Sequence, residues 1–561
     1  MLSLVGIPSV RFDVTLGSWT GSARNDATGR NSQVIKRITD GGKIITDRHQ
    51  IATGGSGQSG TGKLGDRRYD NFRMHKAMYS DDINELKAKL ICSRCVGEAY
   101  LSDEIELMGV GAQCSYCGEI GNSITLEDLA DRVETAFEDH YTRTSDQPDS
   151  WEQALISDRE SNYDWERAGE SVIDAIENAA EIPSQAAADI QALLDDKHGD
   201  FDSAAMGRET EFSSNTYYEE KGTNTSAWQE EWRTFENSLK TEARFFSQTG
   251  AVHLATMFGN VDTLKTRNRR PLVVNAGPKR VLNHLFRARV FQTDDELKKA
   301  LCRPDQHLGP PPVRLASGGR MNAQGISVFY GATAARAAIA EVRPPVGSKV
   351  VVANFTITRP LRLLDLTALG KAWDGGSIFD PTFKSRLERI AFLQLLGDRM
   401  THPVMPDDEA FDYLPTQAIA DFLATQNKPQ FDGIIFRSVQ VKGGRNVVLF
   451  HKAARVETMK LPHGTEIETH SGYGTEDGWE IDYSVSERVP PMPPPANDDD
   501  AWDLAPPFPS PVYHFNETDF RDVALCVDSE SVSVHHVEWV SFRFTTHSVS
   551  RHRSEKAREK I

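Results

Sequence analysis

The chain has 561 residues, of which 39% are hydrophobic and 26% charged, as is typical of soluble proteins. At roughly 150 residues per domain this length predicts three or four domains, and the net charge of −18 argues against general nucleic-acid binding, which needs clustered Lys and Arg. No hydrophobic run approaches the ~20 residues that span a bilayer and no signal peptide is recognisable, so we expect a cytoplasmic protein.

Residues 1–75 are rich in Gly, Ser and Thr and predict a poorly structured extension. Gly57 to Lys63 superficially fit a phosphate-binding loop. Leu64 then stands where that loop needs a hydroxyl for magnesium, and no hydrophobic strand precedes it. The pattern therefore favours a flexible segment over a nucleotide site.

Two cysteine pairs follow within residues 76–120, Cys92 with Cys95 and Cys114 with Cys117. Two CxxC pairs at this separation are typical of a four-cysteine zinc ribbon, in which protein ligands fill all four positions. We therefore predict a structural zinc ion; the alternative is free thiols or a redox pair. The two other cysteines, Cys302 and Cys526, are isolated.

Residues 121–250 are acidic and show helical periodicity, which predicts a helical regulatory domain. From Thr125 to Tyr141 hydrophobic residues recur every three or four positions, and Thr125 is a suitable N-cap. Further helices are expected near Ser171–Ala180, Ser184–Leu194 and Trp228–Phe246.

Residues 255–455 alternate between strand and helix patterns and predict an α+β domain. The expected strands are Ser327–Tyr330, Lys349–Ile357 and Gly433–Phe436. The expected helices are Thr333–Val342 and Pro415–Ala424. A β-rich tail (456–487), a Pro- and Asp-rich linker (488–512) and a C-terminal extension (513–561) follow. The extension contains a strand-like stretch from Val532 to Thr546 and has no assigned role.

Chemistry-bearing residues gather in this α+β domain. Gly318 and Gly319 allow close approach of the backbone to a ligand, and Arg320 follows with a planar cation suited to phosphate. Tyr330 closes a short strand, and its ring could stack on a flat heterocycle. Glu341 ends a helix of small residues, where a lone carboxylate needs a partner or a function. Without further information, a structural Arg320–Glu341 ion pair, with Tyr330 as a core residue, is the favoured interpretation.

These residues, together with Ser438 in an Asp-Gly-Ile-Ile-x-x-Ser context, resemble the RES domain family, named for its Arg, Glu and Ser. The resemblance spans about 170 residues and includes Arg320 and Asn322 in Gly-Gly-Arg-x-Asn, Tyr330, Glu341, Asn446 and the opening strand with Arg287 and Arg289. Met321 replaces a usual aromatic residue, and a long insertion separates Glu341 from Ser438.

The resemblance implies a fold similar to ADP-ribosyltransferases and an enzyme that degrades NAD by hydrolysis or phosphorolysis, acting as a toxin or defence effector. By that resemblance Arg320, with Arg287 or Arg289, would bind the pyrophosphate, and Glu341 would stabilise the cation-like ribose. Tyr330 would stack on nicotinamide or fix the ribose, and Ser438 would orient a hydroxyl or the amide. Asn322 and Asn446 are further candidate ligands for NAD.

The front of the chain resembles the HEPN/RES N-terminal domain, so the whole is expected to be multidomain, with a zinc-ribbon and helical module before an α+β RES domain. Nuclease HEPN domains carry an Arg-polar-x4-His motif; Arg132 and His140 depart from it and favour a structural role. Two alternatives stay open, an ADP-ribosyltransferase that modifies a protein and an inactive zinc-ribbon binding protein. The expected partner is an antitoxin or regulatory protein. Binding to a membrane or to nucleic acid is not expected.

Overall fold

The computed structural model describes residues 82–491 and 519–554, except 201, 204, 205, 243–246, 406, 477 and 542. The predicted extension of residues 1–75, including the loop from Gly57 to Lys63, lies outside these residues, as does most of the linker at 488–512. Within the described part, no helix is both long and hydrophobic enough to cross a bilayer.

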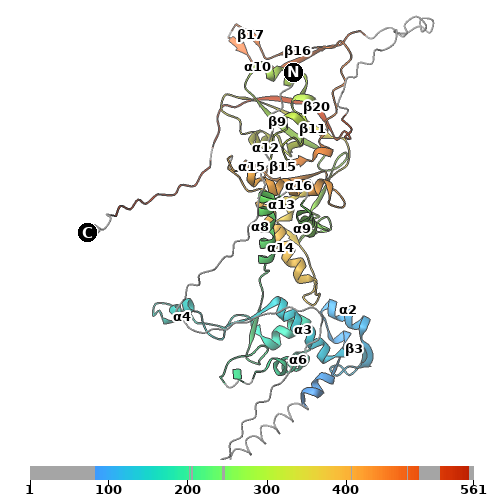
Figure 1. Ribbon diagram of the computed structural model, residues 1–561, viewed down its shortest axis with the longest axis vertical. Coiled ribbons are helices and arrows are strands. Elements are labelled where there is room, and N and C mark those ends of the chain that lie inside the picture. Colours follow the sequence, from blue (N-terminus) through green and yellow to red (C-terminus); the bar gives the residue numbers. More distant parts are fainter. Residues whose placement is uncertain are drawn as a thin grey trace, which may run out of the picture. The chain divides into compact units, whose positions relative to one another are not determined.

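The first part of the described chain is an N-terminal module of two three-stranded sheets and several helices (Figure 1). Its elements are β1 (Leu90–Cys92), η1 (Ser93–Cys95), α2 (Ala99–Met108), β2 (Val110–Gln113), β3 (Ile120–Thr125), α3 (Leu126–His140), β4 (Tyr141–Arg143), α4 (Ser150–Ser157), β5 (Glu170–Ser171), α5 (Val172–Ala180), α6 (Ser184–His198) and β6 (Tyr217–Glu220). The sheets have the orders β1-β3-β2 and β4-β6-β5, with antiparallel pairing throughout.

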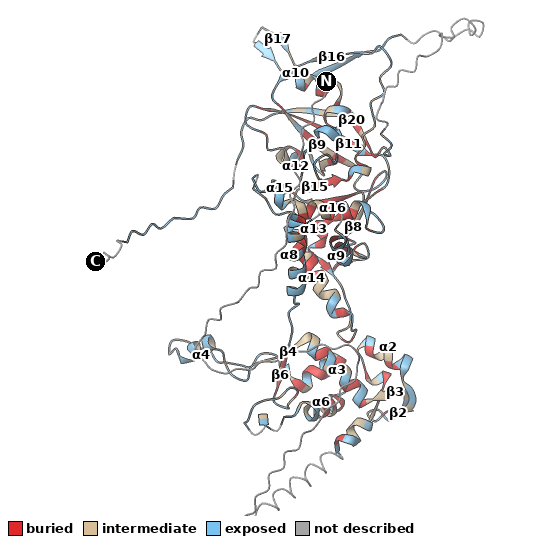
Figure 2. Cartoon of the chain, in the orientation of Figure 1, coloured by how far each residue is buried: buried red, intermediate tan, exposed pale blue. Residues whose placement is uncertain are grey.

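One hydrophobic core holds this module together. The helix predicted from Thr125 to Tyr141 is confirmed as α3, and the Thr125 side chain accepts a hydrogen bond from the Asp128 backbone N–H as an N-cap. The buried face of α3 packs with α5 and α6, and also with Ile91 and Leu101 from the cysteine-bearing segment (Figure 2). The cysteine-bearing sheet and the helices thus share a single core.

The rest of the chain is organised around an eight-stranded sheet with the order β20-β11-β9-β10-β15-β14-β12-β8. Its strands are β8 (Val273–Ala276), β9 (His284–Phe291), β10 (Phe329–Ala332), β11 (Lys349–Ile357), β12 (Leu361–Asp365), β14 (Gly433–Arg437), β15 (Arg445–Leu449) and β20 (Leu525–His536). Among these strands only β12 and β14 pair in parallel. Between β9 and β10 a single residue pair, Phe286 with Ala332, joins the two halves of the sheet.

Helices cover this sheet in separate groups (Figure 1). They are α8 (Ser226–Thr241), α9 (Gln248–Phe258), α10 (Asp294–Cys302), α11 (Pro304–His307), α12 (Ala335–Glu341), α13 (Leu366–Leu369), α14 (Phe383–Arg399), α15 (Glu409–Asp412) and α16 (Leu414–Thr425). The small helix α12 packs on β9, β10 and β11, with Ala337 and Ala338 buried against the sheet. Helices α8, α9, α14 and α16 form one hydrophobic core over β8, β12 and β14.

Short elements complete the described chain. They are η2 (Val313–Leu315), η3 (His451–Ala453), the paired strands β7 (Lys265–Thr266) and β13 (Ala372–Trp373), and the two hairpin pairs β16 (Glu466–His470) with β19 (Ser484–Arg488) and β17 (Tyr473–Thr475) with β18 (Gly478–Glu480). The strand expected from Val532 to Thr546 is wrong in its bounds. Strand β20 begins at Leu525 because it pairs with β11 along its length, and the chain is no longer extended in a sheet beyond His536.

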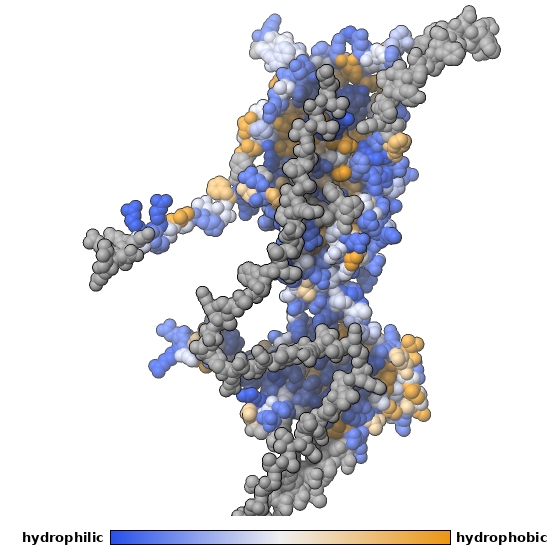
Figure 3. All heavy atoms as spheres, in the orientation of Figure 1, coloured by the Kyte–Doolittle hydropathy of each residue, from blue (hydrophilic) through white to orange (hydrophobic). Residues whose placement is uncertain are grey.

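Hydrophobic side chains also reach the surface of the N-terminal module. Leu107, Met108, Val110 and Ile120 are all more than two-thirds exposed. Figure 3 shows hydrophobic residues gathered on the surface over α2 and β3. These side chains lie outside the core that α3, α5 and α6 form.

Candidate active site and metal centre

Glu341 and Ser438, which are 97 positions apart in the sequence, meet in the structure. The Ser438 hydroxyl donates a hydrogen bond to Glu341 Oε1 at 2.7 Å. Glu341 is the last residue of α12, and Ser438 directly follows β14. The fold therefore brings together two residues that the sequence could place in one site only by family resemblance.

The Ser438 side chain has a specific orientation because its oxygen is also an acceptor. The backbone N–H groups of Gln440 and Val441 donate to Ser438 Oγ at 3.2 and 3.1 Å. Since both amides supply hydrogens, the single hydroxyl hydrogen is left to point at Glu341. Ser438 is buried, so this arrangement fixes the carboxylate against a rigid support.

Glu341 occupies an electrostatically unfavourable position at the C-terminal end of α12, where the helix carries partial negative charge. The preceding residues are mostly alanines buried on the sheet, which bring the helix close to β9 and β10. Among the described residues, no cation forms an ion pair with Glu341, and Ser438 is its hydrogen-bond partner. The simple ion pair with Arg320 that the sequence left open is therefore not what the structure has.

The loop that carries Arg320 is held from inside by Asn322 and Tyr330. The buried Asn322 amide donates to the carbonyl groups of Ser317, Ala323 and Ile326, and its oxygen accepts from the Tyr330 hydroxyl at 2.8 Å. Tyr330 also accepts from the Met321 backbone N–H. Burial raises the pKa of Tyr330 to about 12, so its hydroxyl stays protonated as a donor.

This arrangement leaves no room for a side chain at Gly319. A Cβ atom there would lie 2.7 Å from Asn322 Oδ1 and 2.8 Å from the Tyr330 hydroxyl oxygen. Asn322 and Tyr330 thus shape the loop through contacts that are already complete, while Arg320 projects from it.

Arg320 contacts a segment far along the chain. Its Nη1 donates to the Met400 carbonyl at 3.1 Å, and its guanidinium lies over the Tyr413 ring at 5.0 Å from the centroid. Neither contact supplies a negative charge. In the part of the chain that the structure describes, Arg320 has no carboxylate partner.

Arg287 is a half-buried cation on β9. Its guanidinium lies over the Phe329 ring at 4.8 Å, and Nη1 is buried without a hydrogen-bond partner. Burial, helped by the neighbouring Arg289, lowers the pKa of Arg287 to about 10, so it stays charged at neutral pH. An anion that accepts a hydrogen bond from the buried Nη1 would stabilise this side chain.

The structure does not bring Arg287 and Arg289 to Glu341 through any direct contact among the described residues. Alternation along β9 turns Arg287 toward the side of Leu285 and Phe291, away from α12. Arg289 donates to the His307 carbonyl at 2.8 Å. Arg287 nevertheless lies close enough to Tyr330 for its charge to oppose, in small part, the rise that burial causes in the pKa of Tyr330.

Asn446, the last of the candidate ligands, is buried on β15 opposite Ala332 and Phe436. Its side-chain oxygen is buried without a hydrogen-bond donor. Because buried amides are almost always paired, this orphaned acceptor marks a place where a donor group from a ligand would be stabilised.

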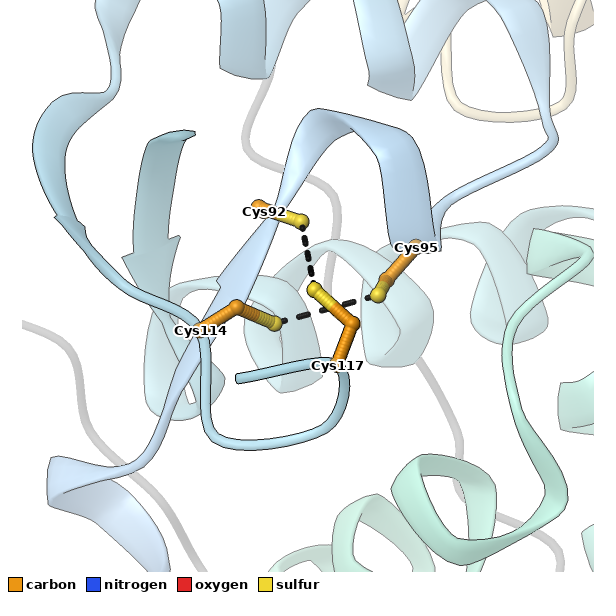
Figure 4. A group of neighbouring side chains, drawn as sticks. All are labelled: Cys92, Cys95, Cys114 and Cys117. Carbon is orange, nitrogen blue, oxygen red and sulfur yellow. Dashed lines mark hydrogen bonds between the residues drawn. The ribbon is translucent and has the colours of Figure 1, made fainter. Parts of the chain in front are cut away.

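The four cysteines form a second candidate site in the N-terminal module (Figure 4). Cys92 and Cys95 lie at the end of β1 and in η1, and Cys114 and Cys117 lie in the turn between β2 and β3. All four sulfur atoms are within 4.8 Å of one another, with 3.6 Å between Cys92 and Cys117 and 3.8 Å between Cys95 and Cys114. Four thiolates around a zinc ion at about 2.3 Å are about 3.8 Å apart, so this donor set fits a tetrahedral metal.

Comparison with known families agrees with the arrangement of the site. The family model of the RES domain matches residues 290–469, a range that contains Arg320, Tyr330, Glu341, Ser438 and Asn446. The chain carries a RES domain. The model of the HEPN/RES N-terminal domain 1 matches residues 109–252, which begins after the first cysteine pair. No curated protein and no solved structure matches the chain.

The eight-stranded sheet of the RES domain extends beyond the matched range at both ends. Strand β8 and most of β9 precede it, and the edge strand β20 follows it. The C-terminal extension, for which the sequence suggested no role, therefore completes the sheet. Likewise α8, which falls in the range of the HEPN/RES match, packs in the same core as α14 and α16 of the RES domain.

Arg132 of the HEPN/RES domain is engaged within the module, whereas the ring of His140 lies 5.9 Å from that of Phe383 in α14. Arg132 makes two hydrogen bonds to the Glu104 carboxylate, at 3.0 and 2.9 Å. Burial lowers the pKa of His140, which ends α3.

Sequence reasoning missed the surroundings of Arg320 in the RES domain. Met400, Tyr413, Thr416 and Gln417 contact the Gly319–Arg320 backbone or the Arg320 side chain. They lie 80 or more positions away, within residues 400–417 of the long segment between Glu341 and Ser438, which the sequence predicts to contain an insertion and which we call the insertion below. No spacing or motif in the sequence connects them to the loop.

Proposed function

We propose that the RES domain degrades NAD by breaking the bond between nicotinamide and ribose. The RES family is associated with NAD-related toxin systems, which supports this general kind of activity. The observation that carries the proposal is the hydrogen bond from Ser438 to Glu341, which holds a carboxylate with no cation of its own among the described residues. A carboxylate that is fixed but not neutralised is suited to stabilise a positive charge that develops during the reaction.

In the proposed reaction the nicotinamide–ribose C–N bond breaks and its electron pair goes to the pyridinium ring, which leaves as neutral nicotinamide. Positive charge then develops on the ribose carbon and its ring oxygen, and Glu341 stabilises it. An oxygen of water or phosphate forms the new bond to that carbon, and its proton is released to solvent. The leaving group needs no acid, so a single fixed carboxylate is sufficient.

The remaining residues would bind the substrate or hold the shape of the site. Arg320 would neutralise the pyrophosphate, with Arg287 as a second candidate cation although it faces the side of β9 opposite α12. The orphaned oxygen of Asn446 would accept a hydrogen bond from a ribose hydroxyl or the nicotinamide amide. In this proposal Ser438 orients Glu341 through their hydrogen bond. This role replaces the direct contact with substrate that the family resemblance suggested for Ser438. Tyr330 and Asn322 hold the loop, and Tyr330 also packs against the core that α8, α9, α14 and α16 form. The opening of the sheet between β9 and β10 supports a likeness to the ADP-ribosyltransferase fold.

The N-terminal module would regulate this activity, and its four cysteines would hold a structural zinc ion. All four ligand positions are filled by thiolates, so zinc would supply stability rather than chemistry here. In this proposal the protein acts in the cytoplasm as a toxin or defence effector, with an antitoxin or regulatory protein as its partner.

The test is to incubate the purified full-length chain with NAD, with and without phosphate, and to identify products by mass spectrometry. We expect nicotinamide together with ADP-ribose or its phosphorylated form. Glu341→Gln should lower the rate about 10²- to 10³-fold, because the fixed charge is lost while the shape is kept. Glu296→Gln, an exposed residue of α10, is the matched control and should leave the rate unchanged.

Two outcomes would redirect the proposal. ADP-ribose attached to a protein in place of free product would indicate a transferase. NAD that stays intact with the unaltered chain would contradict the proposed activity and favour an inactive binding protein.

A further inference from the structure

The insertion between Glu341 and Ser438 contacts the loop that carries Arg320 at four points. Two involve the Arg320 side chain, the hydrogen bond to the Met400 carbonyl and the stacking on Tyr413. Two involve the backbone, where Thr416 Oγ1 donates to the Arg320 carbonyl at 2.6 Å and Gln417 Nε2 donates to the Gly319 carbonyl at 2.8 Å. The insertion therefore fixes both the position of the loop and the direction of its guanidinium.

Tyr413 is itself firmly placed. It lies between α15 and α16, and its hydroxyl donates to Glu409 Oε1 at 3.1 Å. The helix α16 that follows it starts with Pro415 in its first turn and buries Ile419 and Leu423 in the core shared with α8, α9 and α14. Burial raises the pKa of Tyr413, so the ring next to Arg320 stays neutral.

Stacking on a ring has a specific consequence for a guanidinium. The Arg320 guanidinium carbon lies over the Tyr413 ring, so the contact uses the π face of the ring and occupies none of the five N–H groups with an acceptor oxygen. The Met400 carbonyl uses one of these donors. The other N–H groups form no hydrogen bond among the described residues, and a guanidinium with free donors can bind two oxygens of a phosphate or carboxylate group.

We propose that Tyr413 is a positioning residue that presents the donor edge of Arg320 to the anionic pyrophosphate of the dinucleotide. The inference rests on the proposed function for the identity of the ligand, while the contact between the two side chains stands on its own. In this view the insertion is a part of the binding site.

The test compares variants at Tyr413 that keep an aromatic ring, Tyr413→Phe and Tyr413→Trp, with variants that lose it, Tyr413→Leu and Tyr413→Gln. Binding of ADP-ribose to the full-length chain is measured by calorimetry, which needs no turnover, and KM and kcat for NAD are measured separately. Loss of the ring should weaken ADP-ribose binding and raise KM roughly 3- to 30-fold, the range of a cation–π contact, with little change in kcat. The ring-keeping variants should behave like the unaltered chain. Tyr473→Leu, at an exposed tyrosine of β17, is the matched control.

A spectroscopic measurement separates positioning from folding. The N–H resonance of the Arg320 side chain, assigned by its loss in Arg320→Lys, should be shifted by the ring in the unaltered chain and in Tyr413→Phe, and should move in Tyr413→Leu. Circular dichroism identifies a variant that fails to fold, and Tyr413→Gln then replaces Tyr413→Leu.

Equal ADP-ribose affinity in ring-keeping and ring-lacking variants would overturn the inference, as would an unaltered chain that binds no ADP-ribose. If the unaltered chain binds ADP-ribose in a Tyr413-dependent way but does not consume NAD, the positioning role stands and the proposed activity fails. If NAD is consumed and Tyr413 has no effect on binding or KM, the proposed activity stands and the positioning role fails.

Discussion

The cysteine cluster of the N-terminal module and the Glu341 site of the RES domain use their polar atoms in opposite ways. Four thiols lie within 4.8 Å of one another and complete a tetrahedral donor set, which leaves no position open for a substrate. In the RES domain, by contrast, Arg287 Nη1 and Asn446 Oδ1 are buried without partners. A site whose donors satisfy one another stabilises the fold, whereas a site with unsatisfied buried groups is less stable when empty and is suited to bind a ligand.

The sharpest way to test this contrast is to remove one cysteine from the closed site. Cys114→Ser should abolish bound zinc and unfold the N-terminal module, because structural zinc contributes on the order of 10 kcal/mol to the folding of small zinc domains. Zinc content and limited proteolysis between residues 82 and 220 are the measurements. The isolated Cys302 provides the control Cys302→Ser, which should retain the metal. A folded, protease-resistant module without zinc would contradict the structural role assigned to the cysteine cluster.

A smaller effect is expected from Ser438→Ala in the Glu341 site of the RES domain. The change removes the support of Glu341 and leaves two backbone N–H groups without an acceptor, which should destabilise the chain by about 1–3 kcal/mol. NAD cleavage should fall well below that of Ser102→Ala, a serine of α2 whose hydroxyl donates to a backbone carbonyl. Equal cleavage rates in the two variants would show that Ser438 has only a structural role.

The smallest effect, and the one that distinguishes the two sites best, is expected at Arg287. Arg287→Met removes a half-buried charge whose Nη1 has no partner and keeps most of the side-chain volume, so the unliganded chain should gain up to about 1 kcal/mol of stability. Binding of ADP-ribose should weaken at the same time. Chemical denaturation and calorimetry measure the two quantities. A variant that loses stability and binds ADP-ribose normally would indicate that Arg287 is a structural residue.

Prediction from the sequence succeeded where the signal is local. The periodicity from Leu126 onward and the Thr125 cap lie within a few residues of each other, and both are present in α3. The RES and HEPN/RES resemblances are confirmed by the family matches. The roles assigned to Arg320, Glu341 and the other site residues stay predictions until they are tested.

What the sequence could not supply depends on distant contacts. The direction of the Ser438 hydroxyl follows from two backbone amides in a turn, and the partners of Arg320 come from an insertion with no motif. The extent of β20 was also misjudged, because strand ends are set by the neighbouring strand and β11 pairs only as far as His536. Local patterns carry no information on either.

The origin of β20 has a consequence for the making of the protein. Strand β11 pairs on one side with β9, and its other side is covered by residues 525–536, which follow the whole RES match in the sequence. During synthesis every residue of the Glu341 site leaves the ribosome before that cover does. Until then the outer edge of β11 presents unpaired backbone groups, a form that associates readily with other strands and is open to proteases. A chain cut short before residue 525 would keep this exposed edge and would be prone to aggregation and proteolysis.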